Sequence, residues 1–489
     1  MRRENDEEIA MKLNELSFRR RFSVNLYRNL RLPMGEMDFH KDWVTDTRGA
    51  PYPLLSRTEG VSEHVLFHLY SVSAVGEGSV RRLLGSFFPW NTYELTVREM
   101  RRDASIGFCL QGEAGDLTVR LSKKELTVFC EECTETYAVL VTKNSKLALT
   151  FRTGGISLYL NDMLIADISL KMMHAYRKEE IFAKATMSLL AVFSGEGNVE
   201  LTDVRWYLCG GISHADIKPI RYEDGTPMIE NGRVFLTVTS RLEAEMYQSV
   251  ISWNPTLCDF RMEGAIFYDC GDGYWCSDVA SSILFDRNSQ KWLVWMAAFS
   301  HGHVLGRGVC TDDPRFGIHI IDVQLMESAE ASHSYTDFVG FDGDEDPDLL
   351  YLDGKWHLAI CRVEKDTGYH YYHFVSDDPF DGYVFVDRTP SGEKTGGLFV
   401  KCEEGYSFVC GSDFKARARY DVYPINDFSN CRHLHCDYDD GGFRGWGTII
   451  LLSVGGRKRY VWITFDRHNA SRYNWSYGNL YVFDSEYLK

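Results

Sequence analysis

Apolar and polar positions alternate in short segments along the chain from residue 61 to residue 209. An alternation with a period of two is typical of strands that bury one face. Turn residues interrupt these segments roughly every eight to twelve positions, which is the spacing of a β-sandwich. We therefore expect a sandwich domain over residues 61–210. Its predicted strands are Val65–Val72, Trp90–Met100, Ser105–Gln111, Leu117–Leu121, Leu126–Cys130, Tyr137–Thr142, Lys146–Phe151, Ile156–Leu160, Met163–Ile168, Thr186–Phe193 and Val199–Cys209.

The region before residue 61 has a different pattern. Apolar residues recur at roughly helical spacing between Glu4 and Arg21, which predicts a short amphipathic N-terminal helix. Such a helix could cap a domain or bind a second copy of the chain, so a homo-oligomer is left open. Residues 30–59 contain several prolines and are expected to form an irregular connector. Residues 1–60 are thus predicted to be a helix and a connector.

A longer motif repeats between residues 211 and 489. Most copies begin with a carboxylate, continue with an apolar strand, and return through a turn to a second apolar strand. The copies begin roughly 50 to 70 residues apart, the length of one four-stranded propeller blade. This repeat predicts a five-bladed β-propeller over residues 211–489. The copies start at Asp224, Asp278, Asp346, Thr395 and Gly445.

The third copy has the densest cluster of acidic residues. Asp344, Glu345, Asp346 and Asp348 directly precede a predicted β-hairpin with an Asp-Gly turn at 353–354. Crowding of like charges raises at least one carboxyl pKa, and a carboxyl group with a raised pKa can donate a proton near neutral pH. The innermost strands of a propeller surround one channel, so carboxylates that open different copies are expected to converge. The alternative is a solvated acidic turn.

Composition narrows the class of protein. A net charge of −17 argues against a nucleic-acid backbone or an anionic membrane surface as the partner. The first residues lead into no apolar secretory segment, and no run of about 18 apolar residues is present. An odd number of cysteines, 13, fits a reducing compartment. We therefore expect a cytoplasmic protein whose partner is a small molecule.

One stretch of the predicted sandwich carries a resemblance. Residues 147–167 read Leu-Ala-Leu-Thr-Phe-Arg-Thr-Gly-Gly-Ile-Ser-Leu-Tyr-Leu-Asn-Asp-Met-Leu-Ile-Ala-Asp. This order of strand, glycine turn and return strand resembles laminin-G and concanavalin-A-like jelly rolls. The resemblance implies a concanavalin-A-like β-sandwich for the first domain.

The C-terminal repeats resemble the five-bladed propeller glycoside hydrolases of families 43 and 32, which include arabinanases, β-xylosidases and invertases. The matching motifs are Glu-Asp-Gly-Thr-Pro at 223–227 and Glu-Asp-Pro-Asp-Leu-Leu-Tyr-Leu-Asp-Gly-Lys at 345–355. The resemblance implies that Asp224 is the general base or nucleophile. It implies that Asp346 tunes the pKa and position of its partners.

The general acid of those families is absent from its usual position. Thr395 stands where they have a glutamate. Glu393 lies two residues earlier, and a two-residue step along a strand keeps a side chain on the same face. Glu345, Asp348 and Glu263 are the other candidate acids, and the remaining alternative is that the chain lacks one. Hydrolysis needs one protonated carboxyl group and one ionised carboxylate, and the family analogy favours inversion.

Other residues are expected to contact the sugar. Asp278 matches the Ala-Pro-Asp-Val segment of the family, and Asp348 belongs to the acidic cluster. Trp275 and Trp446 are expected to stack on the sugar, and Arg444 to bind a hydroxyl or carboxylate. The alternatives are aromatic packing between blades and, for Arg444, an ion pair within the propeller.

No cofactor is expected to be required. Some members of these families hold a calcium or sodium ion in the channel through a histidine of the fifth blade. The resemblance leaves such an ion open here, with His433 or His435 as its ligand. His301 and His303 form another His-x-His pair, for which the sequence supplies no complete set of zinc ligands.

The sequence therefore predicts an all-β protein whose propeller hydrolyses a glycosidic bond of a small oligosaccharide or glycoside. A small substrate follows from the expected cytoplasmic location. Two alternatives stay open. One is a carbohydrate-binding protein without catalysis, which Thr395 suggests. The other is a glycoside phosphorylase, in which Arg417, Arg419 and Arg444 would bind phosphate.

Overall fold

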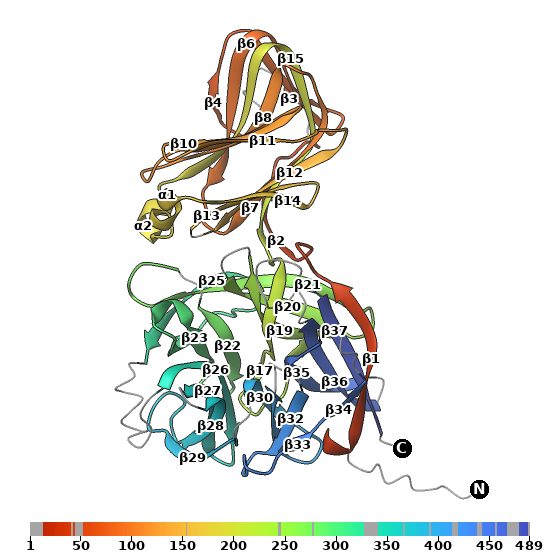
Figure 1. The fold of residues 1–489 in the computed structure, drawn as a ribbon, viewed down its shortest axis with the longest axis vertical. Helices are drawn as coiled ribbons and strands as arrows, with labels where there is room; N and C mark the ends of the chain where they lie inside the picture. The colour runs from red at the N-terminus through yellow and green to blue at the C-terminus, as the bar shows by residue number, and fades with distance from the viewer. Residues whose placement is uncertain are drawn as a thin grey trace, which may run out of the picture.

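The computed structural model describes residues 13–40, 43–44, 52–152, 154–242, 246–275, 278–326, 341–364, 367–390, 393–412, 419–437, 443–454, 457–466 and 479–487. The predicted all-β class is confirmed. Within these ranges the only α-helices are the short α1 (Lys171–Ala175) and α2 (Glu179–Phe182). Neither helix is long and apolar enough to cross a bilayer. Figure 1 shows a β-sandwich above a ring of smaller sheets.

The upper domain is one extensive sheet folded into two layers (Figure 1). The long strand β15 (Thr186–Cys209) belongs to both layers, because its first half pairs with β8 and its second half with β7. The largest hydrophobic core of the molecule includes this domain. The other strands are β2 (Arg31–Glu36), β3 (Trp43–Val44), β4 (Leu54–Arg57), β5 (Val61–Leu66), β6 (Leu69–Ser86), β7 (Asn91–Met100), β8 (Ala104–Gln111), β9 (Leu117–Ser122), β10 (Glu125–Cys130), β11 (Thr134–Ala138), β12 (Ser145–Arg152), β13 (Gly155–Leu160) and β14 (Met163–Ser169).

The expectation of an irregular connector over residues 30–59 is wrong in part. Strand β2 pairs with β15 and β4 pairs with β6, so both belong to the sandwich. Pro33 lies in β2, opposite Tyr207 and next to a register shift. Strand β2 pairs with β15 alone, and an edge strand tolerates a proline because one side of its backbone has no ladder to break.

Within the described residues the lower domain consists of four sheets around a ring (Figure 1), and the largest of them has two antiparallel halves joined by one parallel pair of strands, so five antiparallel units can be distinguished. Their inner strands, β16, β22, β26, β30 and β35, contact one another in this order, and β35 contacts β16 to close the ring. The units are β16 (Ser213–Pro219), β19 (Arg233–Arg241), β20 (Met246–Asn254) and β21 (Asp259–Asp269); β22 (Val279–Asp286), β23 (Lys291–Ala298), β24 (Val304–Cys310) and β25 (Gly317–Leu325); β26 (Phe341–Leu352), β27 (Lys355–Glu364), β28 (Gly368–Ser376) and β29 (Val384–Arg388); β30 (Thr395–Lys401), β31 (Tyr406–Ser412), β32 (Arg419–Pro424) and β33 (Arg432–His433); and β35 (Phe443–Val454), β36 (Arg457–Asp466), β37 (Asn479–Tyr487) and β1 (Leu16–Asn25). Short strands β17 (Arg221–Tyr222), β18 (Ile229–Glu230) and β34 (His435–Asp437) accompany them.

The prediction of an N-terminal helix is wrong for the residues that the structure describes, because most of them belong to strand β1. Only Leu13–Glu15 form a 3-10 turn, and residues 16–25 form a strand. This strand pairs antiparallel with β37 and parallel with β34, so the two ends of the propeller chain close one sheet. Leu16 and Phe18 are fully buried, and the Phe18 ring packs edge-on against Trp462 at 5.8 Å. Apolar residues two positions apart fit a strand better than a helix.

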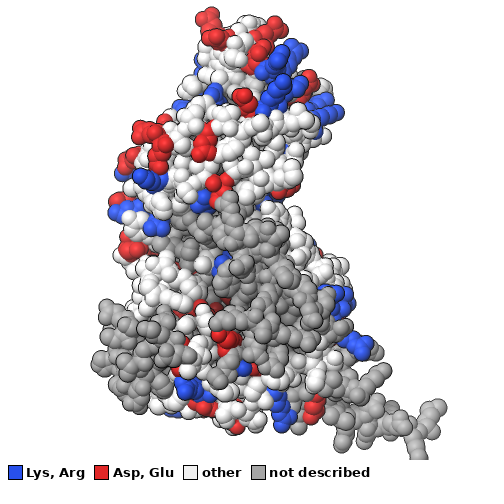
Figure 2. Space-filling model, viewed as in Figure 1, with Lys and Arg blue, Asp and Glu red and all other residues white. Residues whose placement is uncertain are grey.

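Aromatic packing joins the two domains. Trp90 of the sandwich lies 4.6 Å from Phe267 of β21, and Phe182 of α2 lies 4.8 Å from Trp275, measured between ring centroids. The same hydrophobic core continues from the sandwich into the first and fifth units of the propeller. Charged side chains are of both signs over the described part of the sandwich surface visible in Figure 2.

Candidate active site

The inner strands of the propeller repeat one backbone irregularity. In each of β16, β22, β26 and β30 two residues oppose a single residue of the next strand, which is a β-bulge. The first residue of each bulge has a positive φ. These residues are Asp216 (53°), Ala280 (56°), Asp346 (49°) and Gly396 (63°). Bulges redirect side chains at the ends of strands and are common beside active sites.

Three carboxylates meet at the bulges of the first and third units. Asp216 accepts a hydrogen bond from Thr239 Oγ1 at 2.7 Å. Asp346 Oδ2 accepts two hydrogen bonds, from Thr395 Oγ1 at 2.8 Å and from the backbone N–H of Gly396 at 2.9 Å. Glu345, the residue before the bulge, lies 3.4 Å from the same Thr395 hydroxyl. This acidic group differs from the predicted one of Asp224, Asp278 and Asp346. It contains Asp346 with its chain neighbour Glu345, and Asp216, which the sequence prediction missed, lies near enough for the charge of Asp346 to act on it.

Burial and mutual repulsion perturb these groups. Burial and then the charge of Asp346 raise the pKa of Asp216 to about 6. Burial also raises the pKa of Glu345 to about 7, and the charges of Asp346 and Asp216 add to this effect, while a hydrogen bond with His303 opposes it. Two carboxyl groups with separated pKa values can serve as an acid and a base near neutral pH.

Other side chains border the carboxylates. His303 Nε2 lies 3.1 Å from Glu345 Oε2, and the Glu345 side chain is 13% exposed. The Cys361 thiol points to Glu345 Oε1 at 3.9 Å. Burial and the charge of Glu345 raise the pKa of Tyr369 to about 12. His303 is thus one of the ionisable neighbours of the cluster, and it lies within hydrogen-bonding distance of Glu345.

Basic side chains from the first unit cross the centre of the ring. Lys218 Nζ donates a hydrogen bond to the carbonyl oxygen of Pro347 at 2.7 Å. Pro347 belongs to the third-unit bulge, so this bond helps to fix the bulge in place. Arg221 pairs with Asp348 at 2.5 Å, and both side chains are about 2% exposed. Asp348 also accepts a hydrogen bond from Ser282 Oγ at 3.0 Å. Asp348 is therefore a buried structural carboxylate, which corrects its prediction as a substrate ligand.

Asp224 lies elsewhere, which corrects its prediction as the catalytic base. Its carboxylate pairs with Lys401 at 2.8 Å and with Arg287 at 3.2 Å. Hydrogen bonds from Lys401 and Thr226 outweigh the effect of partial burial and lower the pKa of Asp224 to about 2. Lys401 ends β30, whereas the Asp346 partner Thr395 begins it. Six residues of strand place these two contacts about 20 Å apart.

An insertion explains the misplacement. The first unit contains β17 and β18 between its inner strand β16 and its second strand β19. A repeat defined by the hairpin of β18 and β19 places Asp224 at the start of the first copy, after the inner strand β16 has already ended. Asp216 lies eight residues upstream of Asp224 in the segment Ser-His-Ala-Asp-Ile-Lys-Pro at 213–219, which mixes polar and apolar residues and so carries only a weak strand signal.

The other predicted ligand contacts have separate locations. Trp275 is 3% exposed and packs among Phe88, Phe182 and Phe267 between the domains, so its prediction as a sugar contact is wrong. Asp278 is 1% exposed and precedes β22 by one residue. Arg444 and Trp446 lie on β35, but their side chains are outside the described part of the chain, as are those of Arg417 and Arg419.

The candidate acid at residue 393 lies beside the cluster. Glu393 has a φ of 53° and precedes β30. Its charge contributes to raising the pKa of Tyr369, which the charges of Glu345 and Asp346 also raise. Glu393 is therefore near the rim of the carboxylate cluster, whereas Glu345 is inside it.

The two candidate channel histidines are not in the channel. His433 lies on β33, the outermost strand of its unit, and pairs with Asp421 at 2.5 Å. His435 lies on β34 at the outer edge of the last sheet and pairs there with Ser17 of β1. The expectation that either residue binds an ion in the channel is wrong, because both lie on edge strands far from the inner ring.

No protein-family model matches the chain, and no curated protein matches it. Among solved structures, a family 43 β-1,3-galactosidase with galactodeoxynojirimycin is 12% identical over 54% of this chain and 93% of its own, with a TM-score of 0.36. A family 62 α-L-arabinofuranosidase from Coprinopsis cinerea is 12% identical over 56% and 91%, with a TM-score of 0.38. A non-specific endo-β-1,3(4)-glucanase of family 16 is 9% identical over 40% and 93%, with a TM-score of 0.26. These neighbours are glycoside hydrolases, and their similarity at this level does not identify functional residues.

Proposed function

We propose that this protein is a glycoside hydrolase whose catalytic carboxylates are Asp216, Glu345 and Asp346. The observation that supports the proposal most directly is the meeting of the three side chains from two propeller units at equivalent bulges. Two carboxyl groups whose pKa values burial raises toward neutrality fit the cleavage of a glycosidic bond, because that reaction needs a protonated and an ionised carboxyl group together.

Each residue has a role that its surroundings support. Glu345 has a pKa of about 7 and is partly accessible, so it is the proposed general acid that protonates the leaving oxygen. Asp216, with a pKa of about 6, is largely ionised at neutral pH and is the proposed base or nucleophile. Asp346 accepts two hydrogen bonds, and its charge raises both pKa values, so it is the proposed modulator. This retains the predicted role of Asp346 and replaces Asp224 with Asp216.

We also propose that the substrate is a small oligosaccharide or glycoside. The side chains of Lys218 and Arg221 reach across the ring and donate hydrogen bonds to residues of the third and fourth units. They therefore occupy space at its centre. A sugar would therefore approach from the end of the ring where Glu345 is accessible, and a chain threaded through the ring would meet buried ion pairs.

The general acid can be tested by leaving-group dependence. Glu345→Gln should lower kcat by about 10²- to 10⁴-fold on alkyl glycosides, the usual contribution of general acid catalysis. It should lose much less activity on dinitrophenyl glycosides, because that leaving group departs without a proton. Glu393→Gln is the matched control and should retain activity on both substrates.

Three results would contradict the assignment. Loss of alkyl-glycoside turnover in Glu393→Gln alone would make that residue the acid. Sugar binding by the wild-type protein without turnover of any glycoside would favour the carbohydrate-binding alternative that Thr395 suggests. Turnover that requires inorganic phosphate would instead indicate a phosphorylase.

A further inference from the structure

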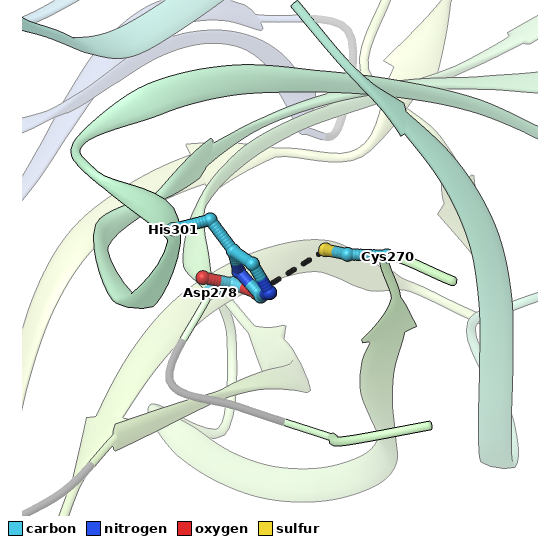
Figure 3. Close-up of side chains that lie close together, drawn as sticks. All are labelled: Cys270, Asp278 and His301. Atoms are coloured by element: carbon cyan, nitrogen blue, oxygen red, sulfur yellow. Dashed lines mark hydrogen bonds and ion pairs between the residues drawn. The ribbon is translucent and has the colours of Figure 1, made fainter. Parts of the chain in front are cut away.

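Three side chains with metal-binding atoms meet at one end of the second propeller unit. Cys270 follows the last residue of β21, Asp278 precedes β22, and His301 ends the 3-10 turn between β23 and β24. One ligand atom from each residue lies within 4.8 Å of the others. Figure 3 shows the thiol, carboxylate and imidazole pointing toward one another from these three connections.

The spacing of these atoms fits a tetrahedral ion. Zinc binds sulfur at about 2.3 Å and nitrogen or carboxylate oxygen at about 2.0 to 2.2 Å. In a tetrahedron these bond lengths place sulfur about 3.6 Å from oxygen and nitrogen about 3.4 Å from oxygen. Cys270 Sγ lies 3.6 Å from Asp278 Oδ2, and His301 Nδ1 lies 3.3 Å from the same oxygen. Two of the three distances therefore already match the edges that an ion would impose, and the sulfur and the histidine nitrogen lie within 4.8 Å of each other.

Neighbouring groups orient the ligands as they do at metal sites. His301 Nε2 lies 3.3 Å from Asp272 Oδ2, so the ring nitrogen that faces away from the cluster has a carboxylate partner. A metal-bound histidine usually donates its other N–H to such a group. The Ser300 hydroxyl donates to Asp278 Oδ1 at 2.7 Å and leaves Oδ2 directed at Cys270 and His301. Asp278 is 1% exposed, and its Oδ1 also accepts a hydrogen bond from the Ser300 backbone N–H at 3.3 Å.

We propose that Cys270, Asp278 and His301 bind one divalent transition-metal ion of the zinc class, with water as a fourth ligand. The mixed sulfur, nitrogen and oxygen set suits zinc and excludes calcium and magnesium, which prefer oxygen ligands alone. The ion would link the β21–β22 and β23–β24 connections. His303 follows His301 by two residues and contacts Glu345, so the ion would also fix the turn that borders the carboxylate cluster.

A cobalt titration tests this site, because cobalt takes the same tetrahedral ligands and its bond to a thiolate gives an intense near-ultraviolet absorption band. The full chain, stripped with a chelator, should bind one Co²⁺ with this band, and Zn²⁺ should displace it. Cys270→Ser and His301→Gln should each abolish the band. Asp272→Asn removes only the outer partner of His301 and should weaken metal affinity about 10- to 100-fold.

The chain offers a matched control. Cys431 belongs to a second group with Asp421 and His433, but there the Lys394 ammonium already pairs with Asp421. Cys431→Ser should therefore leave cobalt binding unchanged. The proposal is overturned if the natively folded chain binds no stoichiometric Co²⁺, which would leave a hydrogen-bonded cluster, or if the band survives in Cys270→Ser or disappears in Cys431→Ser.

Discussion

The ion pair at the centre of the ring provides a stringent test of the fold. Arg221 donates to Asp348 Oδ2 at 2.5 Å, to the carbonyl of Leu349 at 2.9 Å and to the carbonyl of Phe399 at 2.7 Å. One side chain of the first unit thus joins the third and fourth units. Arg221→Met keeps most of the apolar volume but removes the charge and all three hydrogen bonds.

The expected loss of stability is large. Removing one partner of a buried ion pair costs about 3 to 5 kcal/mol, because the other charge stays buried without compensation. Asp348 would retain its hydrogen bonds from Ser282 and from the backbone N–H of Phe399, so we expect the lower part of this range. The double substitution Arg221→Met with Asp348→Leu removes both charges and should recover much of the loss.

Urea denaturation followed by tryptophan fluorescence measures the effect as a change in the free energy of unfolding. Lys355→Met is the control, because Lys355 pairs with Asp377 at 2.6 Å and the two side chains are 49% and 82% exposed. An exposed pair of this kind contributes at most about 1 kcal/mol. A loss below about 1 kcal/mol for Arg221→Met, equal to that of the control, would refute the description of a buried cross-ring pair.

Three further outcomes are expected. The pH profile of kcat/KM should be bell-shaped. Activity should fall below about pH 6, where Asp216 gains a proton, and above about pH 7, where Glu345 loses one. A profile that is flat from pH 5 to 9 would contradict these roles. Phe18→Ala should destabilise the chain by about 3 to 5 kcal/mol in urea denaturation, because Phe18 is fully buried under the closing sheet, whereas a helix on the surface would lose little. Gly107→Ala should lower the melting temperature, because the added Cβ would lie 1.9 Å from the Val119 carbonyl oxygen. Gly76→Ala is the control and should leave the melting temperature unchanged, because its Cβ would meet nothing within 4 Å. Equal melting temperatures for the two variants would argue against this strand packing.

The sequence was informative where a local pattern determines the structure. The Asp-Gly turn predicted at 353–354 is confirmed: both residues have positive φ, and Leu352 pairs with Lys355 across it. The copies that begin at Asp346 and Thr395 do correspond to inner strands. Alternation with a period of two also predicted most strands of the sandwich, which share one core. It was wrong at Val65–Val72, which contains the turn between β5 and β6, and at Tyr137–Thr142, where the strand is Thr134–Ala138.

Long-range contacts decided the remainder. The residues at 16–25 became a strand because β37 and β34 offer it backbone partners, which local apolar spacing could not reveal. Trp275 was expected at a ligand because it precedes a carboxylate by a few residues, yet the sandwich covers it. Asp216 was missed because its direction depends on a bulge, and a bulge is visible only when the pairing with β19 is known.

The most direct test of the active-site proposal compares two substitutions that are eight residues apart. Asp216→Asn and Asp224→Asn remove the same charge, but only the first changes the carboxylate cluster. On an aryl glycoside that the wild-type enzyme hydrolyses, kcat of Asp216→Asn should fall by about 10²-fold or more, while that of Asp224→Asn stays within a few-fold of wild type. Loss of turnover in Asp224→Asn with full activity in Asp216→Asn would contradict the proposed site.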